Sequence, residues 1–122
     1  MNGNWLLYDF HIHTRFSDGS LFLEEVVDLY GTKGFYVITI SDHILDSNSW
    51  DACTEKGQDP RVIPENAFQD YLQLLWREAR RAWETYRMLL IPGTEITNNT
   101  GGCHILAVDI KDYIDPGSSV EI

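Results

Sequence analysis

The chain has 122 residues, 43% of them hydrophobic and 12% aromatic, a composition that suits one packed domain and excludes a disordered segment. It has 9 Lys and Arg residues against 19 Asp and Glu residues, and the net charge of −10 argues against an extended nucleic-acid surface. The apolar run from Trp5 to Tyr8 is stopped by Asp9, so we expect no signal peptide and no membrane partner. Cys53 and Cys103 form no CxxC pair, which fits a protein of the reducing cytoplasm.

The hydrophobic pattern predicts strands that alternate with helices. The expected elements are a strand, a helix, a strand, a long helix and two strands, at residues 5–13, 21–31, 35–40, 65–86, 88–91 and 104–110. Ser20 is the expected N-cap of the first helix, and Gly31 and Gly34 are its expected stops. Residues 46–64 have no periodicity and many turn-forming residues, so we expect an irregular insertion over the strand ends that could act as a lid.

This β-α-β-α-β-β order favours an α/β fold with a parallel sheet and right-handed crossovers, either an open sheet or part of a barrel. In both architectures functional residues collect at the C-terminal ends of the strands. His13, His43 and Glu95 all fall at such ends, where core packing requires no polar residue. An S-x-x-E pattern at 118–121 predicts the start of one more helix, beyond the last expected strand.

Histidines mark the candidate site. His11 and His13 are one residue apart on the first expected strand, so both imidazoles, together with Asp9, are expected on one face. That spacing lets two nitrogens reach one cation, although a single HxH pair is often an ordinary pair of histidines. All four histidines of the chain lie at or beside expected strand ends, which strengthens the metal-binding interpretation.

Carboxylates accompany the histidines. Asp18 lies in a Ser-Asp-Gly turn, where it could bind a cation or close an Asx-type turn. Asp42 could bind directly or orient an imidazole, and we favour orientation. Glu95 ends an apolar strand, where a buried carboxylate is costly unless it is paired or bound to metal. If residues 98–101 form a four-residue hairpin loop, His104 lies directly opposite Glu95, and Glu95 could bridge two cations.

These residues form motifs that resemble the polymerase and histidinol phosphatase family, abbreviated PHP. The motifs are Asp9-Phe10-His11-Ile12-His13-Thr14 through Ser17-Asp18-Gly19, then Ser41-Asp42-His43, Pro92-Gly93-Thr94-Glu95 and His104-Ile105-Leu106. The resemblance implies a distorted seven-stranded β/α barrel, similar to a TIM barrel, of which this chain is the N-terminal part. It also implies two or three divalent ions, commonly manganese, zinc or iron.

The resemblance also assigns ligands. It gives one ion to His11, His13 and Glu95, which form the expected catalytic centre, a second to Asp18 and His43, and a third to Glu95 with His104. Asp9 and Asp42 are then expected to orient the ligand side chains without binding the ions themselves. The family pattern continues with another histidine and an Asp-x-His pair, and no histidine follows His104. We therefore expect a fragment of a longer protein, or a chain completed by a partner or by oligomerisation.

The expected activity is the hydrolysis of phosphate esters by a metal-activated water, with small phosphomonoesters, nucleotides or oligonucleotide ends as substrates. Arg15 could grip the phosphate or could be a solvated loop residue. One alternative is a catalytically incomplete module that binds metal or supports a larger protein. Another is hydrolysis of a C–N bond, as in amidohydrolases with HxH on the first strand, but the Ser-Asp-Gly and Ser-Asp-His motifs argue against it.

Overall fold

Five strands form one mixed sheet. The computed structural model describes residues 5–98 and 103–117. The strands are β1 (Tyr8–Ile12), β2 (Val37–Ile40), β3 (His43–Leu45), β4 (Leu89–Asn98) and β5 (Cys103–Val108). Strands β1, β2 and β4 are parallel neighbours in that order, and β5 runs antiparallel along β4. The prediction of an α/β fold with parallel strands is confirmed, and so is the final antiparallel pair.

Strand β4 pairs with two strands in succession along the same edge. Its first residues pair with β2, and after a break at Ser41 and Asp42 its later residues pair with β3. The sequence interpretation ended the strand at residue 40 and missed β3, because a short Ser-Asp-His segment has no strand pattern of its own. This break matters for the site, since the register sets His43 directly beside Glu95.

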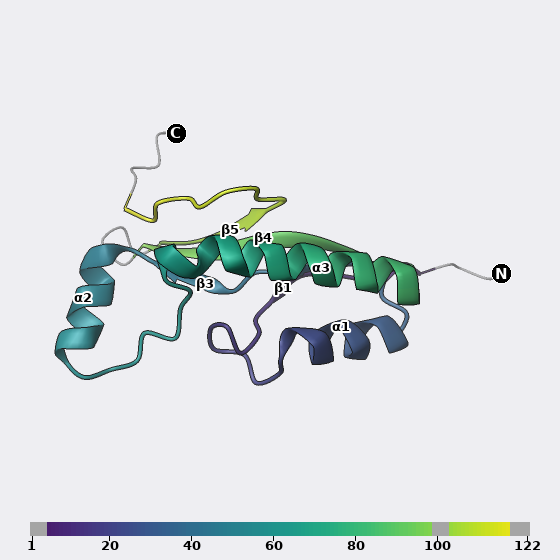
Figure 1. Cartoon of the computed structure of the whole chain (residues 1–122), viewed down its shortest axis with the longest axis horizontal. Helices are drawn as coiled ribbons and strands as arrows, with labels where there is room; N and C mark the ends of the chain where they lie inside the picture. Colours follow the sequence, from purple (N-terminus) through teal and green to yellow (C-terminus); the bar gives the residue numbers. More distant parts are fainter. Residues whose placement is uncertain (1–4, 99–102, 118–122) are drawn as a thin grey trace.

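The helices α1 (Leu23–Thr32) and α3 (Phe68–Tyr86) lie side by side against one face of the sheet (Figure 1). Polar contacts join them: Asp28 accepts a hydrogen bond of 2.7 Å from the Arg81 guanidinium and another of 2.7 Å from the Tyr86 hydroxyl. Between helices and sheet lies the core, which includes Val27, Ile38, Ile40, Phe68, Leu72 and Leu75. Packing in this core fixes the positions of the strand ends, which carry the candidate ligands.

Helix α1 differs from its prediction at both ends. Its N-cap is Phe22 rather than Ser20, and the Phe22 N–H donates to the Glu25 carboxylate at 2.8 Å. Gly31 does not stop the helix but lies inside it, where a Cβ would come within 2.3 Å of the Tyr86 ring. Gly34 follows the helix with φ of 80°, a conformation that glycine adopts without strain.

The segment 46–64 is more regular than its sequence predicts. It contains helix α2 (Ser47–Glu55), capped by Asp46, which accepts hydrogen bonds from the Ser49 N–H and hydroxyl at 3.0 and 2.7 Å. None of the α2 side chains is buried, so the helix has no apolar stripe by which the sequence could have revealed it. A short 3-10 helix, η1 (Glu65–Ala67), then leads into α3, whose predicted start at residue 65 was three residues early.

Within residues 5–98 and 103–117, no helix combines the length and the apolar character that crossing a bilayer requires. The helix start predicted at 118–121 lies outside the described residues.

Candidate metal centre

All six predicted ligands lie close together. They come from β1, the turn after it, β3, β4 and β5: His11, His13, Asp18, His43, Glu95 and His104. Their ligand atoms form three groups in which all three atoms lie within 4.8 Å of one another: His11, His13 and Glu95; His13, Asp18 and His43; His43, Glu95 and His104. Glu95 lies within β4 rather than at its end, because β4 continues to residue 98 beside β3.

The group of His11, His13 and Glu95 has the spacing of a coordination shell. The two Nε2 atoms are 3.1 Å apart, and they lie 3.0 and 2.8 Å from the same oxygen, Oε2 of Glu95. Ligands about 2.1 Å from an ion are about 3 Å apart in an octahedral site, where adjacent bonds form a right angle, and about 3.4 Å apart in a tetrahedral site. Nitrogen and carboxylate donors of this kind suit manganese, zinc or iron.

The other two groups share residues with the first. Asp18 lies between two imidazoles, 2.6 Å from Nδ1 of His13 and 3.3 Å from Nε2 of His43. His104 approaches the second oxygen of Glu95, with 3.3 Å from its Nδ1 to Oε1. Oε2 of Glu95 lies against His11 and His13 and, at 3.5 Å, Nδ1 of His43, while Oε1 lies against His104, so this carboxylate contacts histidines of both groups.

The shared histidines limit how many groups can fill at once. A neutral imidazole gives one nitrogen to one ion, and its other nitrogen carries a proton. His13 and His43 each belong to the group that contains Asp18 and also to one other group. Only the groups of His11, His13, Glu95 and of His43, Glu95, His104 avoid sharing a histidine. Together they can hold two ions bridged by Glu95, with Asp18 orienting His13 and His43 by hydrogen bonds.

The pairing of β4 with β5 corrects one predicted contact. His104 lies opposite Thr97, and Glu95 lies opposite Leu106, two residues from the predicted register. A shift of two residues keeps His104 on the predicted face of the sheet, so it still reaches Glu95 diagonally. The Thr97 hydroxyl lies between two imidazoles, 3.2 Å from Nδ1 of His43 and 3.4 Å from Nδ1 of His104. The sequence analysis missed Thr97 because its position depends on this register.

Both candidate carboxylate ligands are held in their charged form. Burial raises the pKa of Glu95, but a hydrogen bond with His11 and the charges of His43, His11 and His13 outweigh burial and lower that pKa below its usual value. Burial likewise raises the pKa of Asp18, while the hydrogen bond with His13 and the charges of His43 and His13 bring the net shift downward. Ionised carboxylates are the form that binds a cation.

Asp42 does not orient an imidazole within the described structure. Its carboxylate is fully buried and accepts hydrogen bonds from the Thr14 N–H at 2.6 Å, the Thr14 hydroxyl at 2.7 Å and the Ser17 hydroxyl at 2.6 Å. These bonds fix the turn between His13 and Asp18. The sequence analysis missed Thr14 and Ser17, because nothing in a turn of small polar residues identifies the buried acceptor.

Asp9 also acts on the backbone rather than on an imidazole. Its carboxylate accepts hydrogen bonds from the Tyr30 hydroxyl on α1 at 2.7 Å and from the His11 N–H at 3.0 Å. The pairing of β1 with β2 is irregular between Asp9 and Ile12, which breaks the expected alternation of faces along the strand. Asp9 therefore tethers the backbone of His11 to α1.

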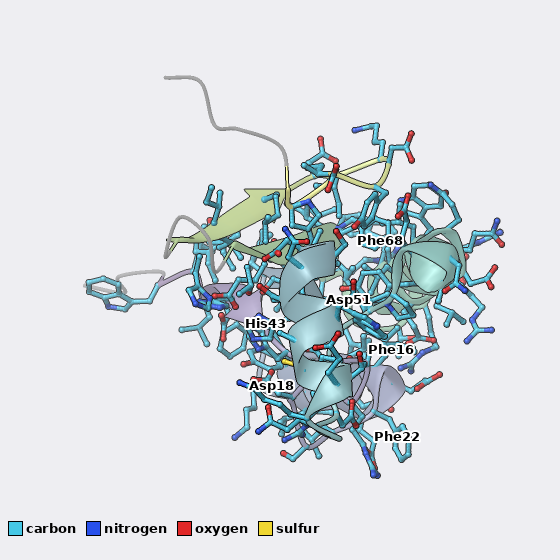
Figure 2. The ribbon with its side chains drawn as sticks, turned by 90° about the vertical axis from the view of Figure 1, so that its left-hand side faces the viewer. Phe16, Asp18, Phe22, His43, Asp51 and Phe68 are labelled. Carbon is cyan, nitrogen blue, oxygen red and sulfur yellow. The ribbon has the colours of Figure 1, made fainter. Side chains whose placement is uncertain are left out.

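A cavity of about 340 Å³ lies beside the ligands. Its lining joins the candidate ligands to the segment after α2, and consists of Asp18, His43, Leu45, Cys53, Pro60, Arg61, Val62, Thr97 and His104. Figure 2, viewed from the end where α2 lies, shows His43 and Asp18 next to each other beside this helix. The insertion therefore lies over the site, as predicted. Arg15 is not part of this lining, since its guanidinium stacks on the Phe22 ring, 4.7 Å from the centroid.

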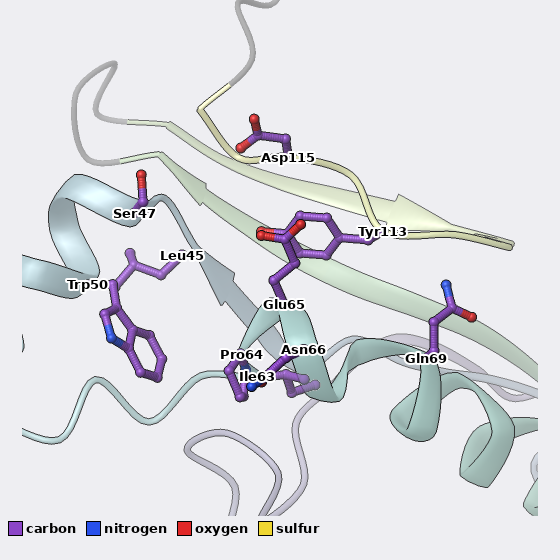
Figure 3. Close-up of a pocket in the computed structure, with 10 residues that line it drawn as sticks. All are labelled: Leu45, Ser47, Trp50, Ile63, Pro64, Glu65, Asn66, Gln69, Tyr113 and Asp115. Atoms are coloured by element: carbon purple, nitrogen blue, oxygen red, sulfur yellow. The ribbon is translucent and has the colours of Figure 1, made fainter.

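A larger cavity of about 960 Å³ adjoins the first, and both include Leu45 in their lining. Figure 3 shows its walls, with Trp50 on α2, Glu65 on η1 and Tyr113 in the segment after β5. Burial and the nearby charges of Glu65 and Asp115 raise the pKa of Tyr113, so its hydroxyl stays protonated. None of the described lining residues of this second cavity is a histidine, so it is a space beside the candidate metal centre.

No model of a known protein family matches the chain, and no curated protein matches it. The case for a metal centre therefore depends on the geometry of the chain's own residues.

Proposed function

We propose that this chain is a metal-dependent phosphoesterase, the activity that the PHP-like motifs imply. The observation that carries the proposal is a pair of ligand groups, His11, His13, Glu95 and His43, Glu95, His104, that share the Glu95 carboxylate and no histidine. Groups that overlap in this way suit neighbouring cations in one cluster, and clusters of two cations are typical of enzymes that transfer phosphoryl groups.

In the proposed reaction the ions would activate water and neutralise charge, and the side chains of the protein would hold the ions in position. Divalent ions bound here would lower the pKa of a coordinated water and neutralise charge on the phosphoryl oxygens. Glu95 would hold ions in both groups, and Asp42 fixes the turn that carries His13 and Asp18. Pro60 and Val62 line the same cavity as Asp18, His43 and His104 and give it an apolar part.

Small substrates fit the charge and shape of the chain best. The net charge of −10 disfavours long polyanions, whereas a single phosphate could approach the cation cluster. The larger cavity, which shares Leu45 with the smaller one, would accept the leaving alcohol. We place the enzyme in the reducing cytoplasm, where Cys53, a free thiol in the lining of the smaller cavity, would stay reduced.

Exposed apolar side chains on the sheet favour a second candidate function. They belong to β1, β4 and β5 and comprise Tyr8, Phe10, Leu89, Ile105, Leu106 and Val108. Ile105 points to the opposite face of β5 from Leu106 and Val108, so these side chains lie on both faces of the sheet and leave apolar area that more protein could cover. In this alternative the metal centre belongs to a module of a larger assembly and turns over substrate only there, or not at all.

The test combines metal analysis with assays. Purified chain is analysed for bound metal and then assayed with p-nitrophenyl phosphate and nucleotides in added manganese. We expect bound metal and hydrolysis, both lost in Glu95→Gln and retained in Glu84→Gln, a matched change on the exposed surface of α3. Metal without hydrolysis in the intact chain would favour the second candidate, and absence of metal would refute both.

A further inference from the structure

The segment that follows α2 brings one arginine to the cavity beside the candidate metal centre. Among the described lining residues Arg61 is the one with a permanent positive charge, and it shares the cavity with Asp18, His43 and His104. A backbone hydrogen bond of 2.9 Å, from the Ile63 N–H to the His43 carbonyl, joins this segment to β3. Ile63 itself is buried in the core. Arg61 is therefore held two residues from a fixed anchor beside a candidate ligand.

The backbone of Arg61 is strained. Its φ is 51°, in the left-handed region that residues with a Cβ rarely adopt. The other described non-glycine residues with positive φ include Arg87, whose conformation ends helix α3 as a C-cap. Arg61 ends no helix, and its N–H donates to the Asp59 carboxylate at 3.0 Å, which holds the turn closed. Strain that the surroundings enforce at a site is often connected with function.

The guanidinium of Arg61 has no carboxylate partner among the described residues. In the part of the chain that the structure describes it forms no ion pair, and neither do Arg15 and Arg87, but those two lie over aromatic rings whereas the exposed Arg61 lines the cavity. Cations bound by the ligand groups would repel a guanidinium in the same cavity. An anion bound between the cations and the Arg61 guanidinium would offset this repulsion, because both positive charges attract it.

We infer that Arg61 binds the terminal phosphate of the substrate, opposite the cation cluster. This inference rests on the proposed function and adds a substrate-binding residue to it. The guanidinium donates parallel hydrogen bonds that match two phosphate oxygens, a geometry that a lysine cannot reproduce. A terminal phosphate, with its non-bridging oxygens free, offers such a pair while another oxygen faces the cations. The substrate class is accordingly a phosphomonoester.

The test measures binding of inorganic phosphate, the common product of phosphomonoester hydrolysis, to the full chain loaded with Mn²⁺. By calorimetry, we expect Arg61→Gln and Arg61→Gly to weaken phosphate binding about 10- to 100-fold. Their Mn²⁺ content should stay that of the unaltered protein. Arg87→Gln is the matched control, because Arg87 also has a positive φ and lies over the Trp83 ring outside the cavity, and it should bind phosphate normally.

Arg61→Gly adds a second readout. Glycine adopts positive φ freely, so this variant should unfold at the same or a higher denaturant concentration than the unaltered protein while it loses phosphate affinity. Equal phosphate binding by the unaltered protein and both Arg61 variants would overturn the inference and leave the proposed function standing. Arginine-dependent phosphate binding without hydrolysis of p-nitrophenyl phosphate would support the inference and refute the proposed hydrolysis. If the unaltered chain binds no Mn²⁺, both are refuted.

Discussion

The buried carboxylate of Asp42 accepts a hydrogen bond from the Thr14 N–H at 2.6 Å, and so joins the break between β2 and β3 to the turn that follows β1. The Asp42 carbonyl accepts two more, from the Glu95 N–H at 3.1 Å and the Thr94 hydroxyl at 2.7 Å. One residue thus connects three segments that carry candidate ligands. The arrangement of His13, Asp18 and Glu95 depends on this connection.

Asp42→Asn should therefore destabilise the protein by about 3 kcal/mol, because an amide nitrogen donates where a buried carboxylate oxygen accepted charge-assisted hydrogen bonds. The measurement is urea denaturation of the metal-free chain. Asp51→Asn, on the exposed surface of α2, is the control and should change stability by less than about 0.5 kcal/mol. An Asp42→Asn variant as stable as this control would show that the network contributes little.

The sharing of histidines predicts the metal stoichiometry. The described residues provide complete groups for two ions at once, joined by Glu95, so elemental analysis should find two ions per chain. Asp18→Asn should keep both ions and weaken their binding about 10- to 100-fold, as expected when a residue that orients a ligand is changed. Loss of one whole ion in this variant would instead make Asp18 a ligand, as the family resemblance implies.

Because Gly31 lies close to the Tyr86 ring, we expect replacement of this glycine by alanine to destabilise the protein, the opposite of its usual effect within a helix. Alanine is favoured over glycine inside a helix by about 1 kcal/mol. Gly31→Ala should nevertheless destabilise the protein by about 1–3 kcal/mol, because the new Cβ would meet the Tyr86 ring at 2.3 Å. In a Tyr86→Ala background the same change should be neutral or stabilising. A double-mutant cycle by denaturation measures this, and additive effects would contradict the packing argument.

The environment of Tyr30 predicts that the stability of the folded protein falls at high pH. Burial, together with the hydrogen bond to Asp9 and its charge, raises the pKa of Tyr30 to about 12. Since the pKa is raised in the folded state, the stabilisation is fully present below the unfolded value of about 10 and is lost as the pH rises through about 12. The absorbance of tyrosinate, compared between the unaltered protein and Tyr30→Phe, should show one tyrosine that ionises near pH 12. A difference centred near pH 10, with circular dichroism showing that the chain is still folded, would refute this.

The sequence determined the class of fold and the identity of the candidate ligands. Apolar runs and helical spacing are local patterns, so they predicted the parallel strands, the two packed helices and the polar residues that follow the strands. The sequence did not predict helix α2, because none of its side chains is buried and it therefore has no apolar stripe. It did not predict β3, because a strand of three residues is too short to show a hydrophobic pattern.

Only the tertiary structure decided how those residues meet. The register of β4 against β5 set Thr97, rather than Glu95, opposite His104. The side chain of Asp42 accepts hydrogen bonds from a turn rather than from an imidazole, and Arg61, which the sequence pattern did not single out, lines the cavity. The physical reason is that register, burial and contacts between distant segments depend on the whole chain packing at once, whereas a sequence pattern records only each segment's own preference.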